Sequence, residues 1–244
     1  MADLFGEYVW QVRTYECGPD GFATLPAICN YLQEAASLNA EALAFSKTNF
    51  EAAGENISWV LTRLKVQMTR YPRWTEKVRL VTYPRGGRRI VAWRDFMLTD
   101  EAGVEFGRAS SEWMLIDLSS RKLVPIPEKV FACANTVRPP VFGEEPFAKL
   151  RWACQETVEP VRFRARRGDI DLNGHVNNVH YISWLLEGAP EGVVQELDVV
   201  FKSETLAGEE VLTEAVETEP GVFVHRVSAP DGRDHVLART RRVR

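Results

Sequence analysis

Residues Asp169–Glu187 read D-I-D-L-N-G-H-V-N-N-V-H-Y-I-S-W-L-L-E, and this stretch decides how the rest of the chain is interpreted. An acid, an amide and an imidazole, Asp171, Asn173 and His175, stand at alternate positions directly before an apolar segment. If the backbone here is extended, successive side chains point to opposite faces, so these three project to one side. The stretch therefore predicts a cluster of reactive groups in front of a helix.

The predicted helix follows His175, because apolar residues recur there at three- and four-residue spacing. These residues are Val179, Ile182, Leu185 and Leu186. Asn177 or Asn178 is a good N-cap for it. The first N–H groups of a helix have no intrahelical partner and its dipole is positive at that end, so an oxygen gaining negative charge would be stabilised beside His175. This arrangement favours acyl transfer.

The composition indicates a globular protein with a substantial core, since 45% of its 244 residues are hydrophobic. No basic segment followed by an apolar block opens the chain, and no run reaches the roughly 20 apolar residues that span a bilayer. We therefore expect a soluble, cytoplasmic protein without a transit peptide or a membrane partner. A net charge of −4 gives no reason to expect nucleic acid binding.

The cysteines are scattered, with no C-x-x-C pair and no histidine at ligand spacing. They are Cys17, Cys29, Cys133 and Cys154. This pattern predicts reduced thiols, with neither a disulfide framework nor a zinc site, and nothing in the sequence indicates a cofactor.

A proline-rich stretch between Leu118 and Thr157 interrupts regular structure and predicts a connector. We place an N-terminal domain at residues 1–135, the connector at 136–157 and a C-terminal domain at 158–244. Each half carries an apolar helix followed by alternating segments typical of antiparallel strands. In the first half Thr24 caps the helix, Pro26 lies in its first turn, and its stripe is Ile28, Leu32 and Ala35.

The predicted strands lie at residues 63–68, 89–98 and 105–116 in the first half and at 198–202, 211–216 and 222–227 in the second. Both halves therefore read as α+β. Large aromatic residues usually pack in cores, which is our interpretation of Trp59, Trp74, Trp93 and Trp113. A lone histidine specifies little, so His180, His225 and His235 are predicted to be structural.

The 171–181 segment closely resembles the D-x-N-x-H-V-N-N-x-x-Y segment of the acyl-acyl-carrier-protein (acyl-ACP) thioesterases, which release fatty acids from fatty-acid synthesis. Residues 56–74, 108–114 (R-A-S-S-E-W-M) and 126–128 (I-P-E) also resemble family segments, and the likeness spans roughly residues 32–216. The resemblance implies a tandem (double) hot-dog fold, in which two central helices are each wrapped by a curved antiparallel sheet and the sheets are joined.

The two halves differ at the motif. Aligning Tyr31 with Tyr181 by eye places Gly21, Ala23 and Leu25 opposite the polar triplet. We therefore expect the first half to be chemically silent and to supply the acyl-chain groove, while the second half hydrolyses the thioester.

The resemblance implies a catalytic set of Asp171, Asn173, His175 and Glu204. A papain-like Cys-His-Asn set has also been invoked for this family, but the residue after the glutamate is Thr205 here. Threonine has no accessible thiolate, and no G-x-S-x-G elbow is present, so we favour water activation.

In that scheme Glu204 is the general base, or the nucleophile of a mixed-anhydride variant. His175 orients the water and protonates the leaving sulfur, because histidine exchanges protons near neutral pH. Asn173 holds the water or the thioester carbonyl, and Asp171 fixes the loop. A slip in alignment would confuse Glu204 with Glu209 or Glu210.

The expected partner is an acyl carrier protein, which is acidic and needs a basic docking patch. The candidate docking residues are Arg162, Arg164, Arg166, Arg167, Lys149 and Arg151. The fold analogy also suggests a homodimer.

Three alternatives remain open. An acyl-CoA thioesterase would also use these arginines, for the phosphates of coenzyme A. A hydratase or dehydratase of the same fold would not explain the N-x-H-V-N-N pattern. A non-catalytic acyl-binding module would be indifferent to Asn173→Ala.

Overall fold

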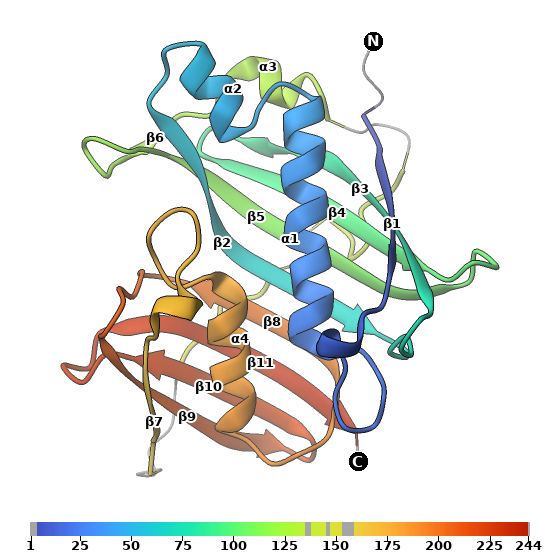
Figure 1. The fold of residues 1–244 in the computed structure, drawn as a ribbon. Helices are drawn as coiled ribbons and strands as arrows, with labels where there is room; N and C mark the ends of the chain where they lie inside the picture. The colour runs from blue at the N-terminus through green and yellow to red at the C-terminus, as the bar shows by residue number, and fades with distance from the viewer. Residues whose placement is uncertain (1–3, 135–137, 145–146, 153–158, 244) are drawn as a thin grey trace. The chain divides into compact units, whose positions relative to one another are not determined.

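The structure is a computed structural model that describes residues 4–134, 138–144, 147–152 and 159–243. The chain divides into two compact units, residues 1–146 and 147–244. The division falls inside the segment predicted as a connector, of which residues 136–137, 145–146 and 153–157 lie outside the described residues. Cys154 lies there too. Each unit contains a central helix and an antiparallel sheet (Figure 1).

The central helix of the first unit is α1, Leu25–Ala42. It begins as predicted, because the Thr24 hydroxyl accepts a hydrogen bond from the Ala27 N–H at 3.3 Å and Pro26 occupies the first turn. The predicted apolar stripe is confirmed: Ile28, Leu32 and Ala35 are all buried. Burial of this stripe, more than helix propensity, stabilises α1.

The sheet of the first unit runs in the order β1-β3-β4-β5-β2, with a short β6 paired to β5, and all these pairings are antiparallel. Figure 1 shows α1 lying along one face of this sheet. Alternation in β2 is confirmed, since Leu64, Val66 and Met68 are buried. The strands are β1 (Gly6–Gln11), β2 (Ile57–Met68), β3 (Lys77–Arg88), β4 (Val91–Thr99), β5 (Glu105–Asp117) and β6 (Leu123–Val124).

The sequence prediction missed β3 and started the next strand early. β3 contains Pro84, Gly86 and Gly87, which are usual strand breakers, and the structure accommodates them with a register shift between Pro84 and Gly86. The run predicted from Arg89 begins only at Val91, because Arg89 lies in the turn with φ +36°. Trp74 was also wrongly predicted to be buried, since it is 57% exposed.

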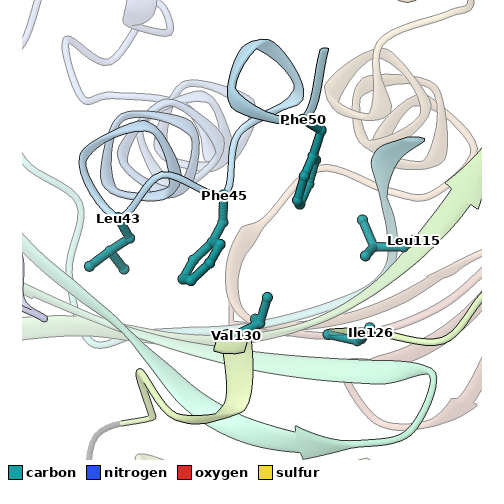
Figure 2. Close-up of a cluster of buried hydrophobic side chains, with 6 residues drawn as sticks. All are labelled: Leu43, Phe45, Phe50, Leu115, Ile126 and Val130. Carbon is teal, nitrogen blue, oxygen red and sulfur yellow. The ribbon is translucent and has the colours of Figure 1, made fainter. Parts of the chain in front are cut away.

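A cluster of buried side chains, shown in Figure 2, ties short helices to the first unit's sheet. The helices are α2 (Lys47–Ala52) and α3 (Glu128–Phe131), and the 3-10 helix η1 (Thr14–Glu16) precedes α1. The cluster comprises Leu43, Phe45, Phe50, Leu115, Ile126 and Val130. The Trp59 indole N–H, beside it, donates to the Phe45 carbonyl at 2.7 Å. These contacts hold α2 and α3 against strand β5 of the sheet.

Residues 138–144 contact the sheet face opposite α1. Arg94 bonds Asn39 of α1 at 2.6 Å, so its neighbour Asp95 faces the other way. Asp95 accepts a hydrogen bond from the Val141 N–H at 3.1 Å and lies 3.4 Å from the Arg85 guanidinium. Burial raises the pKa of this carboxyl. Part of the proline-rich stretch is therefore anchored to the first unit.

The second unit repeats the plan with helix α4, Asn178–Glu187. The predicted N-cap is confirmed, since the Asn177 carboxamide oxygen accepts from the Val179 N–H at 3.0 Å. Val179, Ile182 and Leu185 are buried, as the spacing predicted. The strand order is β8-β11-β10-β9-β7, antiparallel throughout. The strands are β7 (Val161–Arg164), β8 (Val193–Phe201), β9 (Glu210–Glu219), β10 (Val222–Ser228) and β11 (Asp234–Val243), with the 3-10 helix η2 at Arg167–Asp169.

The α+β prediction is confirmed in both units. Within the described ranges, no helix is both long and apolar enough to cross a membrane.

Candidate active site

The polar triplet lies in a tight turn, and the prediction of an extended backbone is wrong. Ile170 and Val176 pair across the turn, the Asp171 N–H donates to the His175 carbonyl at 2.9 Å, and the Gly174 N–H donates back to the Asp171 carbonyl at 3.0 Å. Gly174 has φ +84°, a conformation that glycine adopts without strain. The Asn173-Gly174 pair is a turn signal that the sequence interpretation overlooked.

Asp171 holds this turn together. Its Oδ1 accepts a hydrogen bond from the Asn173 backbone N–H at 2.8 Å, and its Oδ2 lies 3.4 Å from the Asn173 Nδ2. A carboxylate that bonds the backbone two residues ahead stabilises an Asx-type turn. The contacts predicted for Asp171, to the loop backbone and to Asn173, are therefore present.

His175 meets Glu204 across the loop. The His175 Nε2 lies 2.9 Å from the Glu204 Oε2, which is hydrogen-bonding distance. The side chains are 25% and 44% exposed, so a substrate can reach both. The structure thus brings together two pairs, Asp171 with Asn173 and His175 with Glu204, on one short loop and the strand end beside it.

The neighbouring glutamates are otherwise engaged. The Glu209 carboxylate accepts a hydrogen bond from the Leu206 N–H at 2.9 Å and closes the turn before β9. Glu210 lies 2.7 Å from the Arg162 guanidinium. Of the three glutamates that sequence alignment could confuse, Glu204 is the one that contacts the imidazole.

Several backbone N–H groups near His175 already donate hydrogen bonds to other groups and cannot bind a substrate oxygen. The Val176 N–H donates to the Thr205 carbonyl at 3.0 Å, and the Asn177 N–H donates to the Asp169 carbonyl at 2.9 Å. The Val179 N–H is taken by the Asn177 side chain. For the Asn178 N–H, at the first position of α4, the described residues show no acceptor, which leaves it as the candidate donor to a developing oxyanion.

The remaining histidines contact residues outside the predicted catalytic set. His180 Nδ1 is 3.6 Å from Asp169, and His235 Nδ1 bonds the Ser203 hydroxyl at 2.9 Å. His225 is buried, bonds Thr240 at 2.8 Å, and has its pKa lowered to about 3, mainly by burial.

The proposed docking residues are all exposed in the second unit. Arg162 pairs with Glu210, and the Arg164 Nε donates to the Gly208 carbonyl at 3.0 Å. Arg166 and Arg167, next to the Asp171 turn, make no ion pair with any residue in the described ranges, and the same holds for Lys149 and Arg151. These four cations are therefore available for a partner's carboxylates.

The first unit contains a loop with the same backbone pairing as the polar loop of the second unit but with different side chains. This pairing corrects the alignment of the two halves that was made by eye. Cys17 pairs with Ala23 as Ile170 pairs with Val176. The residue after each pair, Thr24 or Asn177, caps the following helix. By this register Gly18, Asp20 and Phe22, rather than Gly21, Ala23 and Leu25, correspond to the polar triplet.

The same register locates the counterpart of Glu204. The Ala23 N–H donates to the Pro72 carbonyl at 2.8 Å, as the Val176 N–H does to Thr205. Tyr71 therefore corresponds to Glu204, and Phe22 to His175. The first unit has an aromatic pair where the second has an acid and an imidazole, so it lacks this pair of proton-transfer groups.

Within the part of the chain that the structure describes, no group of three or more His, Cys, Asp or Glu residues could hold a metal ion. Cys17, Cys29 and Cys133 are free thiols, and burial raises the pKa of Cys29 to about 12.

Two protein-family models together match most of the chain. The model of the acyl-ACP thioesterase N-terminal domain matches residues 5–134, and that of the acyl-ACP thioesterase C-terminal domain matches residues 154–241. The chain belongs to the acyl-ACP thioesterase family. As a family member, it carries the polar loop within the C-terminal domain match.

Curated relatives of this acyl-ACP thioesterase family member include two plant proteins. Oleoyl-acyl carrier protein thioesterase 2 of Arabidopsis thaliana is 32% identical over 205 residues, covering 78% of this chain and 56% of that protein. Palmitoyl-acyl carrier protein thioesterase of Cuphea hookeriana is 29% identical over 254 residues, covering 95% and 60%. The chain thus spans somewhat more than half the length of these relatives.

Solved structures show the fold of this family member. An acyl-ACP thioesterase from Bacteroides thetaiotaomicron matches with a TM-score of 0.85 and 23% identity, covering 97% of both chains. A 12:0-ACP thioesterase from Umbellularia californica matches with a TM-score of 0.84 and 23% identity, covering 99% and 98%. The predicted hot-dog fold is confirmed.

Proposed function

We propose that this chain hydrolyses fatty acyl-ACP thioesters to free fatty acid and holo-ACP, and so terminates chain elongation in fatty-acid synthesis. The observation that supports this most directly is the 2.9 Å contact between His175 Nε2 and Glu204 Oε2 at an accessible surface. A carboxylate bonded to an imidazole is a combination suited to activating water and protonating a leaving group. Family membership supplies the reaction class.

The reaction assigns one task to each group. Glu204 takes a proton from a water molecule while the oxygen of that water attacks the thioester carbonyl carbon. The Asn178 N–H donates a hydrogen bond to the developing oxyanion. When the C–S bond breaks, His175 gives a proton to the departing thiolate, and Glu204 returns its proton through the pair. Asn173, held by Asp171, donates through its amide to the carbonyl or orients the water.

A mixed-anhydride route remains open, in which Glu204 itself attacks the carbonyl. Single turnover in ¹⁸O-labelled water with enzyme in excess detects an anhydride that water opens at the Glu204 carbon. Direct attack by water puts ¹⁸O into the fatty acid in the first turnover. An anhydride whose acyl carbon is attacked by water does the same, but one opened at the Glu204 carbon leaves ¹⁸O in the enzyme.

The first unit is proposed to bind the acyl chain. A small cavity of about 10 Å³ lies against α1, with room for about one water molecule. Its lining is mostly apolar: Leu32, Gln33, Leu61, Leu64, Phe96, Ser111 and Trp113. A methylene chain entering here must displace these side chains, so their size should set the preferred chain length.

The exposed arginines next to the turn are proposed to dock the carrier protein. Arg166 and Arg167 precede the turn directly, and a carrier protein is acidic, so opposite charges would guide the thioester to His175. Coenzyme A phosphates would also bind arginines, so acyl-CoA is the competing substrate. A homodimer in the cytoplasm is the expected setting.

The test is thiol release from matched acyl-ACP and acyl-CoA substrates by the wild-type protein and by Glu204→Gln. We expect release from acyl-ACP that falls by about 10²- to 10⁴-fold in the variant, the usual contribution of a general base. Glu191→Gln, an exposed glutamate of the same unit, is the matched control and should behave as wild type. Equal rates for Glu204→Gln and Glu191→Gln would exclude the proposed mechanism, and faster release from acyl-CoA would favour the competing substrate.

A further inference from the structure

Glu204 lies just beyond the paired part of β8, where strand pairing no longer fixes the backbone. The last residue pair between β8 and β11 at this end joins Phe201 to Val236. From Lys202 onward the chain belongs to no helix or strand until β9 begins. The position of the Glu204 carboxylate therefore depends on individual hydrogen bonds made by its neighbours.

The residue before Glu204 is bonded to β11 through its side chain. The Ser203 hydroxyl donates to the Asp234 carbonyl at 3.0 Å, and its oxygen lies 2.9 Å from the His235 Nδ1. The His235 carbonyl also accepts from the Lys202 N–H at 2.8 Å. His235 thus binds this segment with both its backbone and its imidazole.

On the other side of Glu204, the polar loop holds the chain. The Thr205 carbonyl accepts from the Val176 N–H at 3.0 Å, and Val176 follows His175 directly. The Thr205 side chain is fully buried, so it does not reach a substrate from the position where a cysteine nucleophile has been invoked for the family. Glu204 is therefore flanked by bonds to the loop of the imidazole and by bonds to β11.

The hydrogens in the contact between Ser203 and His235 follow from their partners. A serine hydroxyl has one hydrogen and the Asp234 carbonyl can only accept, so this hydrogen points to the carbonyl. The His235 Nδ1 must then carry a hydrogen of its own and donate it to the Ser203 Oγ. The Ser203 carbonyl, 3.3 Å from the same nitrogen, is a second acceptor for it. Burial lowers the pKa of His235, so the ring is neutral at neutral pH with its hydrogen on Nδ1.

The imidazole of His235 has little freedom to turn. Its residue is 1% exposed, and its ring packs against the Tyr181 ring with centroids 6.4 Å apart. Side chains in a close-packed interior stay in one rotamer, so the Nδ1–H points in one direction. It is a fixed donor for the segment that carries Glu204.

The first unit has a phenylalanine at the corresponding position. The Thr69 N–H donates to the Phe106 carbonyl at 2.9 Å, as the Lys202 N–H does to the His235 carbonyl. By this register Phe106 corresponds to His235, and its ring has no hydrogen to donate. The imidazole donor therefore belongs to the unit that carries the carboxylate, and a hydrocarbon ring takes its place in the unit that lacks it.

We propose that His235 is a positioning residue for the hydrolysis, and that its Nδ1–H bond to Ser203 fixes the segment after β8 so that Glu204 stays at bonding distance from His175. The assignment rests on the proposed function and extends it to a residue that does not touch the substrate. Without this bond the carboxylate would be held from the Thr205 side and by the backbone of Lys202, and its distance from the imidazole would vary.

Two amide side chains separate the hydrogen bond from simple filling of space. The asparagine Nδ2 is as many bonds from Cα as the histidine Nδ1, so His235→Asn keeps a donor facing Ser203. The glutamine Nε2 matches the other ring nitrogen instead, so His235→Gln is closer in volume to histidine but aims its donor elsewhere. Ser203→Ala removes the acceptor.

Thiol release from acyl-ACP is measured for the wild-type protein and these three variants. We expect kcat to fall by about 10- to 100-fold in His235→Gln and in Ser203→Ala, since small misplacements of catalytic groups cost this much, while KM changes by less than about twofold. His235→Asn should keep most of the wild-type kcat. The double variant of His235→Gln with Ser203→Ala should be no slower than the slower single variant, because the same bond is lost in each.

His225→Gln is the matched control, because it makes the same change at a buried histidine of the same unit that bonds Thr240 instead of Ser203. It should keep the wild-type kcat at neutral pH. Circular dichroism and thermal unfolding show whether each variant is folded.

Two results would overturn the assignment and leave the proposed function intact. One is a wild-type kcat in both His235→Gln and Ser203→Ala, and the other is an equal loss of kcat in His235→Asn and His235→Gln. Should the His235 variants fail to fold, Ser203→Ala alone decides, with an unchanged kcat refuting the assignment. A wild-type protein that releases no thiol would overturn both the assignment and the proposed function.

Discussion

Replacing His225 by glutamine should flatten the acid dependence of stability. His225 is 1% exposed, its Nε2 bonds the Thr240 hydroxyl at 2.8 Å, and its pKa is lowered to about 3 by burial and by the nearby Arg242 guanidinium. The folded protein therefore holds this imidazole neutral at pH values where the unfolded chain protonates it. Glutamine retains a hydrogen-bonding amide but does not titrate.

The size of the effect follows from linkage between protonation and unfolding. The folded pKa lies below the unfolded value of about 6.5, so the contribution of the neutral imidazole is complete above that pH and is lost progressively as the pH falls toward 3. At pH 5 the pH lies about 1.5 units below the unfolded pKa of the imidazole and still above its folded pKa. Protonation of the unfolded state therefore lowers the free energy of unfolding by an amount on the order of 2 kcal/mol.

The assay is urea unfolding at pH 7.5 and pH 5.0 for the wild-type protein, His225→Gln and Thr240→Val. The wild-type free energy of unfolding should fall by about 2 kcal/mol more than that of His225→Gln between the two pH values. Thr240→Val keeps the imidazole and removes its hydroxyl partner, so it should be less stable at both pH values yet keep the steep pH dependence. Equal pH dependence in wild type and His225→Gln would refute the reasoning.

Three further outcomes are expected. Thr24→Ala removes the N-cap of α1 and should lower the free energy of unfolding by about 1 kcal/mol, whereas Thr24→Ser should retain it; equal midpoints in urea for all three proteins would contradict this. Arg166→Ala with Arg167→Ala should lower kcat/KM for acyl-ACP and weaken its dependence on salt, with kcat unchanged, and a salt dependence identical to wild type would exclude docking at these residues. Trp113→Leu enlarges the cavity beside α1 and should shift the preferred substrate to longer acyl chains, as a chain-length series of acyl-ACPs would show; an unchanged profile would place the chain elsewhere.

The sequence predicted the two central helices and the polar residues before α4 because their signals are local. Thr24 with Pro26, and Asn177 before an apolar stripe, are capping patterns that act within one turn. The strand β3 was missed for the opposite reason: Pro84, Gly86 and Gly87 break strands locally, and pairing to β4 with a register shift overrides them.

Within the candidate site, Asp171, Asn173 and His175 were recognisable because they lie close together in the sequence. Glu204 was not distinguishable from Glu209 by local pattern, and only the fold shows that one contacts His175 and the other closes a turn. His235 presented the same difficulty, because its bond to Ser203 depends on the pairing of β11 with β8, which no local pattern reports.

The comparison between the two halves failed in detail for a similar reason. Matching Tyr31 to Tyr181 displaced the alignment by three residues, since the tyrosines do not occupy equivalent positions after their N-caps. Backbone pairing gives the register instead, and it places Phe22 and Tyr71 where the second unit has His175 and Glu204.

The most direct test of the proposed function is a count of products from a long-chain acyl-ACP, with binding measured in parallel, for the wild-type protein and Asn173→Ala. We expect wild type to yield one free fatty acid and one holo-ACP for each thioester consumed. Asn173→Ala should bind the same acyl-ACP but release product at least about 100-fold more slowly. A wild-type protein that binds acyl-ACP and releases neither product would contradict the account and show a binding module instead.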